Sequence, residues 1–307
     1  MQLNALRYFA MVAATGSFAA TARHFQVPAS SVSRFISALE RELGQQLLYR
    51  NTRSVRLTET GARYVAQVRE ALDALDLATE QAAGKDSAVR GLIRINAPVA
   101  LGRLHVAQII HKLQAAYPEL TAELTLTDAF IDPVQEGVDI TVRIGTLPDS
   151  GLIARKVGDQ NTVLCASPAY LRQHGTPATP QDLERHSCLV YKGQSGAQRW
   201  FFRRTKDDAP LIVRAEGPLR SNNAEVLVAA ALAGRGIVLF PTWIFERESF
   251  RGRKLVRLLP QWMGTVDVQP AEIHLVSPEN RLRSLKVRTV LDFMLKTIGS
   301  PPYWDAL

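Results

Sequence analysis

Apolar residues recur every three or four positions through most of the first 83 residues, which is the period of an amphipathic helix. We expect a first helix over about residues 3–13 and a second that begins at Ser17, a hydroxyl residue suited to an N-cap. The segment Gln26-Val27-Pro28 predicts a tight turn, because proline does not continue the preceding helix. A third helix, capped by Ala29 or Ser30, is expected to end at Gly44 and to bury four apolar side chains, Val32, Ile36, Leu39 and Leu43.

The opposite face of this third helix is polar and its side chains are short. It carries four serines and one arginine, Ser30, Ser31, Ser33, Ser37 and Arg34. Small hydroxyl side chains let a helix approach base edges in the major groove, and an arginine bonds a guanine edge or a phosphate. Taken alone, the pattern fits both a DNA-reading helix-turn-helix and an ordinary solvated helix face.

A short basic ribbon follows and favours the DNA-binding interpretation. Arg50, Thr52, Arg53 and Arg56 lie in it, and Val55-Arg56-Leu57 alternates as a strand. A basic hairpin after a recognition helix is typical of a wing that straddles phosphates or enters a minor groove. Residues 1–69 hold nine arginines and three glutamates, so this part supplies +6 of the formal net charge of +8.

A long helix is predicted from Thr58 or Glu59 to about Ala83. Two rows of residues spaced by seven form its apolar seam, Val65, Leu72 and Thr79 in one and Val68, Leu75 and Ala82 in the other. A seam of this length exceeds what a small winged domain covers, so a second copy of the chain is the expected partner. Packing on its own chain is the alternative. Residues 84–87, Gly-Lys-Asp-Ser, predict a hinge.

From residue 92 onward, strand patterns alternate with helical ones. Strands are expected at 92–97, 121–128, 138–144, 162–166, 187–191, 211–215, 237–240, 255–258 and 272–276, with helices at about 100–117, 224–233 and 284–297. The order strand, helix, strand, helix, strand predicts a parallel, doubly wound α/β sheet.

Composition limits the classes of protein that remain. The 307 residues allow two or three domains, and 46% hydrophobic with 21% charged residues is ordinary for a globular protein. No apolar run reaches the 18 or so residues of a membrane span, and no cleavable signal is recognisable, so a cytoplasmic location is expected.

Enzymatic and metal chemistry find little support in the sequence. Gly193-Gln194-Ser195-Gly196 lacks the spacing of a nucleophile elbow, and the six histidines form no i, i+4 pair. Cys165 and Cys188 are too few for a disulfide framework and are expected to be buried thiols, with a redox pair as the less favoured alternative. We expect no catalytic residue, no metal and no cofactor.

The ordered residues of the first 61 positions resemble the LysR-type transcriptional regulators. The residues that carry the resemblance are Leu3 to Phe9, Val12, Gly16-Ser17-Phe18, Ala19, Ala22, Val27, Val32-Ser33-Arg34, Ile36, Leu39-Glu40, Leu43-Gly44, Leu47-Leu48, Arg50, Thr52-Arg53 and Leu57 to Gly61. The family usually has Ser-Gln where this chain has Pro28-Ala29, so a glutamine that often meets a base is missing. The resemblance implies DNA contacts by Ser30, Ser31, Ser33, Arg34, Arg50, Thr52 and Arg53.

The resemblance also implies a domain plan. Residues 1–58 would be a winged helix-turn-helix, 59–91 a dimerisation helix and hinge, and 92–303 an effector module resembling a periplasmic binding protein. Its first lobe would span about 92–162 and 267–301, and its second about 163–266. Family members commonly form homodimers and homotetramers on double-stranded DNA.

An effector in such a module is expected between the lobes, against helix N-termini at the ends of strands. The candidate residues are Pro98, Val99, Ala100, Arg143, Asn222, Asn223 and Thr242. Helix N-termini attract anions, which suggests a small carboxylate, whereas the apolar side chains at 99–101 suggest a less polar ligand or none. Arg143 either pairs with an anion or bonds a local carboxylate such as Asp139 or Asp149.

Three functions compete on the sequence alone. A ligand-responsive, sequence-specific regulator accounts for the whole ordered motif. A non-specific architectural DNA binder needs only the basic charge and leaves about 200 residues of α/β module unexplained. A solute-binding or enzymatic α/β protein would use the winged domain for protein contacts. In the first, ligand-driven closure of the lobes would change the spacing of the DNA-reading heads through the long helices.

Overall fold

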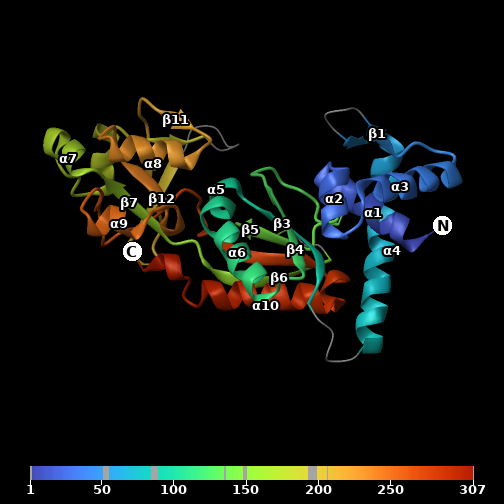
Figure 1. Ribbon diagram of the computed structural model, residues 1–307. Coiled ribbons are helices and arrows are strands. Elements are labelled where there is room, and N and C mark those ends of the chain that lie inside the picture. The colour runs from blue at the N-terminus through green and yellow to red at the C-terminus, as the bar shows by residue number, and fades with distance from the viewer. Residues whose placement is uncertain are drawn as a thin grey trace.

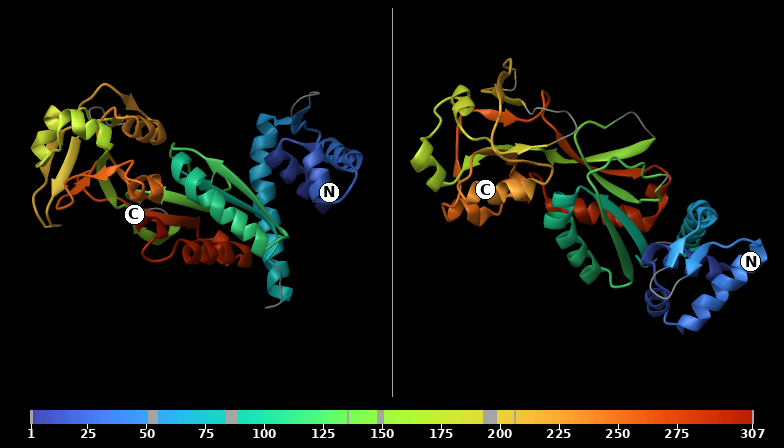
Figure 2. Two further views of the ribbon diagram at one scale, coloured as in Figure 1. Left: turned by 60° about the vertical axis from the view of Figure 1, so that its left-hand side comes forward. Right: turned by 90° about the horizontal axis from the view of Figure 1, so that it is seen from above.

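The computed structural model describes residues 2–50, 55–83, 89–134, 136–147, 151–192, 199–205 and 207–306. It has three parts in a row, an N-terminal helical domain, a central α/β lobe and an outer α/β lobe (Figures 1 and 2). We call the central one lobe I and the outer one lobe II. None of the helices in the described ranges has the length and apolar character needed to cross a membrane.

The N-terminal domain is three helices, a two-stranded ribbon and the start of a long helix. Its elements are α1 (Leu3–Thr15), α2 (Phe18–His24), α3 (Ala29–Leu43), β1 (Leu48–Arg50), β2 (Val55–Leu57) and α4 (Glu59–Ala83). The apolar positions of α1 and α3 face each other, so that Phe9, Val12, Val32 and Ile36 are fully buried. The helical spacing of the sequence therefore produces the core that holds α3 in place.

The helix ends follow local chemistry. Ser17 Oγ accepts a hydrogen bond from Ala20 N at 3.1 Å and caps α2, as expected, and Gly44 ends α3 with a φ of +63°. The expected cap of α3 at Ala29 or Ser30 is wrong, since Pro28 is the N-cap residue and makes no side-chain cap bond. Leu43 is 37% exposed, because the helix has reached the edge of the domain there.

The ribbon is fixed to the helices by side chains. Glu40 Oε1 accepts hydrogen bonds from the amides of Leu47 and Leu48, at 3.0 and 3.1 Å. Thr58 Oγ1 donates to Gln46 O at 2.7 Å and accepts from Gly61 N at 2.9 Å, so one hydroxyl closes the ribbon and caps α4. The wing is thus held at a fixed angle to α3.

The apolar seam of α4 is divided between two environments. Val65 and Val68 are each 4% exposed, and Leu72 packs with them against the N-terminal domain. Leu75, further along, is 40% exposed, and Thr79 lies on the surface. The expectation that the whole seam faces a second copy is therefore wrong for its first half, which α1 covers. The predicted hinge at 84–87 lies outside the described residues.

Lobe I is built on a five-stranded sheet in the order β4-β3-β5-β15-β6. Its elements are β3 (Gly91–Ala97), α5 (Val99–Leu101), η2 (Gly102–Val106), α6 (Ala107–Ala116), β4 (Leu120–Leu126), β5 (Ile140–Ile144), β6 (Leu152–Asp159), β15 (Glu272–Pro278), η5 (Arg281–Arg283), α10 (Leu285–Ile298) and η6 (Tyr303–Asp305). β3 pairs in parallel with β4 and β5, whereas β15 is antiparallel to β5 and β6. The sheet is mixed, so the expectation of an all-parallel sheet is wrong.

Lobe II consists of three small sheets, ordered β12-β7-β13, β10-β9-β14 and β11-β8. Its elements are β7 (Thr162–Ala166), α7 (Pro168–His174), η3 (Pro180–Arg185), β8 (Val190–Tyr191), β9 (Arg199–Arg203), β10 (Leu211–Arg214), β11 (Arg220–Ser221), α8 (Ala224–Leu232), β12 (Val238–Pro241), η4 (Thr242–Ile244), α9 (Arg247–Arg251), β13 (Val256–Arg257) and β14 (Met263–Thr265). The chain crosses between the lobes twice, at residues 160–161 and 266–271.

Candidate DNA interface and effector pocket

The polar face of α3 lies on the surface of the N-terminal domain. Ser30 and Arg34 are exposed, and Ser31, Ser33 and Ser37 are half-buried on the same side. The other side of α3 holds Val32, Ile36 and Leu39 at no more than 1% exposure, so burial fixes which face is presented. An exposed helix with short side chains and one projecting guanidinium has the shape that enters a major groove.

The wing follows directly. β1 and β2 pair antiparallel, with Tyr49 opposite Arg56 and Arg50 opposite Val55. Arg56 and Tyr49 are exposed on this ribbon. Thr52, Arg53 and the side chain of Arg50, all predicted to contact DNA, lie outside what the structure describes. The predicted interface thus brings Ser30, Ser31, Ser33 and Arg34 together on α3, with the base of the wing next to them in the chain.

A cavity of about 260 Å³ lies between the two lobes. Its walls are largely apolar, and the lining residues are Pro98, Val99, Ala100, Asp128, Ile144, Gln160, Thr162, Tyr191, Asn222, Asn223, Ala224, Leu239, Phe240, Pro241, Trp243 and Val266. Residues of lobe I, of lobe II and of the first crossing therefore share one wall. This is the position in which two-lobed α/β proteins hold small molecules.

Five of the seven predicted effector residues line this cavity, namely Pro98, Val99, Ala100, Asn222 and Asn223. The other two do not. Thr242 is 8% exposed and donates to Asp305 Oδ1 at 2.5 Å, which places it behind the wall. Arg143 donates to the carbonyl oxygen of Ile131, and its guanidinium carbon lies 4.1 Å from the ring centroid of Phe130. Asp139, one of the two carboxylates expected as alternatives for Arg143, accepts a hydrogen bond from Arg94 N instead, and Asp149, the other, lies outside the described residues.

At each helix start that borders the cavity, one amide already has an acceptor. Val99 N donates to Asp128 Oδ1 at 3.0 Å, and Val226 N donates to Asn223 Oδ1 at 3.1 Å. Asp128 supplies the one charged side chain among the described lining residues. Burial, helped by the charge of Asp128, raises the pKa of the Tyr191 phenol, which therefore stays neutral. The described wall of the cavity thus carries one negative and no positive side chain.

Sequence reasoning missed several polar side chains of the cavity, Asp128, Gln160, Thr162 and Tyr191 among them. Asp128 is the last residue of the strand pattern TAELTLTD, and a carboxylate at the end of a strand is a signal that the sequence contains. Gln160 lies in the lobe crossing and carries no such signal. Its Oε1 is buried and, like the indole nitrogen of Trp243, has no hydrogen-bond partner among the described residues.

The lobes are also joined outside the cavity. Arg103 of η2 pairs with Glu225 of α8, with Nε to Oε2 at 3.2 Å. His105 of lobe I makes a second link. Its Nδ1 lies 2.7 Å from the Tyr303 hydroxyl, and its Nε2 lies 2.7 Å from Trp243 O in lobe II. Burial lowers the pKa of His105.

The segment after α10 crosses from lobe I back to lobe II. The Asp305 carboxylate accepts hydrogen bonds from Thr242 Oγ1 and, at 3.0 Å, from Asn161 Nδ2. Arg247 donates to Tyr303 O at 2.8 Å. This tail therefore fastens lobe II in addition to the two covalent crossings.

The two parts of the chain match two family descriptions. Residues 3–62 match "Bacterial regulatory helix-turn-helix protein, lysR family", and residues 86–299 match "LysR substrate binding domain". A recognition helix with a wing, joined to a two-lobed α/β module, defines a DNA-binding transcriptional regulator with an effector-binding domain. The chain belongs to the LysR family of transcriptional regulators.

Relatives with similar sequences span nearly the whole chain. The regulator DmlR of Escherichia coli K12 is 34% identical over 292 residues, which cover 95% of this chain and 93% of that protein. The probable regulator LtrA of Klebsiella pneumoniae is 32% identical over 305 residues, with 97% and 96% covered. These relatives are transcriptional regulators and not enzymes, in agreement with the absence of an enzymatic motif from the sequence.

Solved structures agree over the same span. The full-length Vibrio cholerae virulence activator AphB is 28% identical with a TM-score of 0.59, covering 96% of this chain and 99% of that one. CrgA of Neisseria meningitidis, a LysR-type regulator, is 27% identical with a TM-score of 0.61, covering 97% and 99%. The expected family, fold class and regulatory function are thereby confirmed.

Proposed function

We propose that this regulator reads a specific operator as a dimer and responds to a small, uncharged, mainly apolar effector held between its lobes. The observation that carries the effector proposal is the occupied helix start at Val99, whose amide already donates to Asp128. A carboxylate ligand would meet the charge of Asp128 instead of a free N–H group. The cavity therefore supports the less polar of the two ligands that the sequence suggests.

The polar groups of the cavity refine this ligand class. Gln160 Oε1 is a hydrogen-bond acceptor and the Trp243 indole N–H is a donor. Neither has a partner among the described residues. A hydroxyl or amide on the ligand would satisfy such groups, which are costly to leave unpaired. A volume of about 260 Å³ suits a single-ring compound, since a cavity of about 150 Å³ holds benzene.

The DNA-binding proposal rests on the presented face of α3. Ser30, Ser31, Ser33 and Arg34 would lie in the major groove, and Arg50, Thr52 and Arg53 of the wing would contact the flanking backbone or minor groove. A dimer would place two such helices on successive turns of one duplex. A tetramer would place two such pairs on it. Effector binding would change the angle between the lobes, and the α4 helices would transmit it to the spacing of the reading heads.

A paired design tests both sites in one protein. Operators are first selected from genomic DNA by the purified regulator, and affinity is then measured at several salt concentrations. Arg34→Ala is expected to weaken operator binding by about 1–3 kcal/mol while leaving thermal stabilisation by effector intact. Val99→Trp is expected to fill the cavity, abolishing that stabilisation while operator affinity is retained. Arg172→Ala, on the exposed surface of lobe II, is the matched control for lost charge.

The effector screen compares neutral single-ring alcohols, phenols and amides with carboxylates of the same size. Neutral compounds are expected to raise the melting temperature of the wild type and not of Val99→Trp. Stabilisation by carboxylates alone would overturn the proposed ligand class. Unchanged affinity and site preference in Arg34→Ala would overturn its assignment to the DNA interface.

A further inference from the structure

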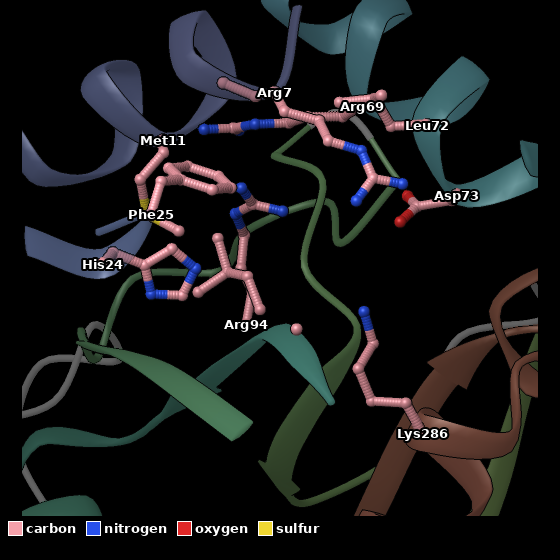
Figure 3. Close-up of a pocket in the computed structure, with 12 residues that line it drawn as sticks. Arg7, Met11, His24, Phe25, Arg69, Leu72, Asp73, Arg94 and Lys286 are labelled. Atoms are coloured by element: carbon pink, nitrogen blue, oxygen red, sulfur yellow. The ribbon is translucent and has the colours of Figure 1, made fainter. Parts of the chain in front are cut away.

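A second cavity lies where the N-terminal domain meets lobe I. It has a volume of about 140 Å³ and is bounded by α1 and α2 on one side, α4 on another, and β3 and α10 on the third (Figure 3). We call it the junction cavity. His24 Nδ1 lies 3.1 Å from Thr121 Oγ1 at one side of the contact, and Arg281 pairs with Asp73 at the other. It is distinct from the effector cavity, with which it shares no described lining residue.

Basic side chains dominate the junction cavity. Arg7, Arg69, Arg94 and Lys286 line it, with Asp73 as the one described carboxylate. In Figure 3 the charged ends of Arg69, Arg94 and Lys286 are directed into the space between the ribbons. The remaining lining is largely apolar, with Met11, Phe25 and Leu72 among it.

Three carboxylates lie close to these cations. Asp73 is held by Arg281, and Glu123 lies 3.2 Å from Arg94 Nε. Asp139 is 2% exposed and accepts a hydrogen bond from Arg94 N at 2.8 Å. Neither Glu123 nor Asp139 lines the cavity. The described walls therefore carry more cations than carboxylates, and Asp139 behind them attracts Lys286, Arg94 and Arg69 together.

Arg69 shows the cost of this arrangement. Burial, followed by repulsion from Arg94, lowers the pKa of Arg69 to about 10, although Glu123 and Asp139 oppose the shift. Its Nε is buried and has no hydrogen-bond partner among the described residues. The two carboxylates thus offset part of the cost of burial, while Nε lacks the acceptor that a buried cation ordinarily has.

We propose that the junction cavity binds a compact anion carrying two or more negative charges, such as phosphate or a short di- or tricarboxylate. Arg69 and Lys286 would supply the charge from opposite walls, and the fork of Arg69 matches the oxygen pairs of phosphate and carboxylate alike. The apolar part of the lining would strengthen this attraction by lowering the local dielectric. A volume of about 140 Å³ accommodates ions of this size.

The position of the site gives the anion a structural role. Arg7 and Arg69 belong to the N-terminal domain and its long helix, whereas Arg94 and Lys286 belong to lobe I. An anion contacting both sides would hold the DNA-binding domain against the effector module. It would stabilise the full chain without entering the effector cavity, so its binding is independent of the proposed effector.

The test uses the full-length protein and defined anions. Melting temperature and calorimetric binding are measured with phosphate, succinate and citrate against chloride at equal ionic strength. The variants are Arg69→Gln and Lys286→Gln, with Arg63→Gln as the control, an arginine of the same helix that is exposed and paired with Glu59. The wild type and Arg63→Gln are expected to bind a multivalent anion, and Arg69→Gln and Lys286→Gln to bind it at least tenfold more weakly.

A second readout separates an anion site from a structural cluster. Because Arg69 is destabilised in the empty cavity, Arg69→Gln without added anion is expected to melt no lower than the wild type. Phosphate-only or carboxylate-only binding identifies the source of the ligand, and either supports the site. Equal anion binding by Arg69→Gln, Lys286→Gln and Arg63→Gln, or an effect matched by chloride, would overturn the proposal. A failed effector screen would leave this result unaffected.

Discussion

Gly61 occupies the closest approach between α4 and the wing. A Cβ built on Gly61 would lie 2.0 Å from the carbonyl oxygen of Leu47, and both partners are backbone. The Gly61 amide also donates to Thr58 Oγ1, so the helix start has no freedom to retreat. Gly44, by contrast, adopts a φ of +63° with open space around it. The two glycines are required for different physical reasons, one steric and one conformational.

We expect the steric requirement at Gly61 and the conformational requirement at Gly44 to cause different losses in the free energy of unfolding. Gly61→Ala should cost about 3 kcal/mol, because an extra methyl is forced into packed backbone. Gly44→Ala should cost about 1 kcal/mol, the conformational cost of a left-handed alanine. Urea denaturation of the two variants measures the difference, and equal losses would contradict the steric argument for Gly61.

His105 makes stability depend on pH. Burial lowers its pKa from the ordinary 6.5, so the folded protein holds it neutral while the unfolded chain protonates it as pH falls. The stabilisation from neutral His105 is complete above about pH 6.5 and is lost on acidification below it. His24 and His186 have pKa values lowered by burial as well and contribute in the same direction.

We expect His105→Gln to lower the free energy of unfolding at pH 7.5 by about 1 kcal/mol, through the lost bonds to Tyr303 and Trp243. The variant should also lose less stability than the wild type between pH 7 and pH 5. His111→Gln, an exposed position of the neighbouring α6, is the control. An unchanged pH profile in His105→Gln would show that other groups govern the acid response.

Individual side chains show what could be predicted from the sequence and what could not. The cap at Ser17, the helix end at Gly44 and the burial of Val32, Ile36 and Leu39 follow from local rules and were predicted correctly, whereas the predicted burial of Leu43 was wrong. The lining position of Asn223 also followed, because a helix start after a strand is visible in sequence. Arg143 did not, since its stacking on Phe130 depends on a loop whose path no local pattern specifies.

At the scale of elements, α4 carries apolar surface that its own chain leaves exposed. Its first half packs on the N-terminal domain, and Leu75 leaves a large apolar side chain 40% exposed beyond it. An exposed leucine in line with a heptad seam is a candidate interface residue. This supports dimerisation through the second half of α4, where the predicted heptad rows continue.

We expect Leu75→Asp to weaken the dimer by at least a hundredfold, about 3 kcal/mol, because the carboxylate would be buried unpaired in the interface. Ala66→Asp, exposed nine residues earlier and on the opposite side of the helix, should leave the dimer unchanged. Sedimentation velocity over a concentration series measures both. A Leu75→Asp protein as dimeric as the wild type would exclude this part of α4 from the interface.

Two elements show why the sheet of lobe I differs from the sequence expectation. β6 was missed, because most of its side chains are exposed or half-buried and Val157 is the one fully buried among them. It is an edge strand, and edge strands lack the apolar alternation on which sequence reasoning depends. β15 was predicted as a strand, but its antiparallel pairing with β5 joins residues over 120 positions apart. Local periodicity carries no information about such pairing.

At the scale of the whole molecule, the order of the domains along the chain can be predicted from the sequence. The contacts between the domains cannot. The helical spacing, the long seam and the strand–helix alternation predicted the N-terminal domain, the connecting helix and the α/β module. The cations that meet at the junction cavity come from four elements spread between Arg7 and Lys286. Only the folded chain brings them together, so no spacing rule would have found them.

The tail at Tyr303–Asp305 gives the two lobes a third point of attachment. Asp305 binds both Asn161, in the first crossing, and Thr242, in lobe II, while Tyr303 reaches His105. Two lobes joined only by the crossings at 160–161 and 266–271 could rotate about a single axis. With this tail in place, a wide swing of one lobe against the other would break several of these hydrogen bonds at once.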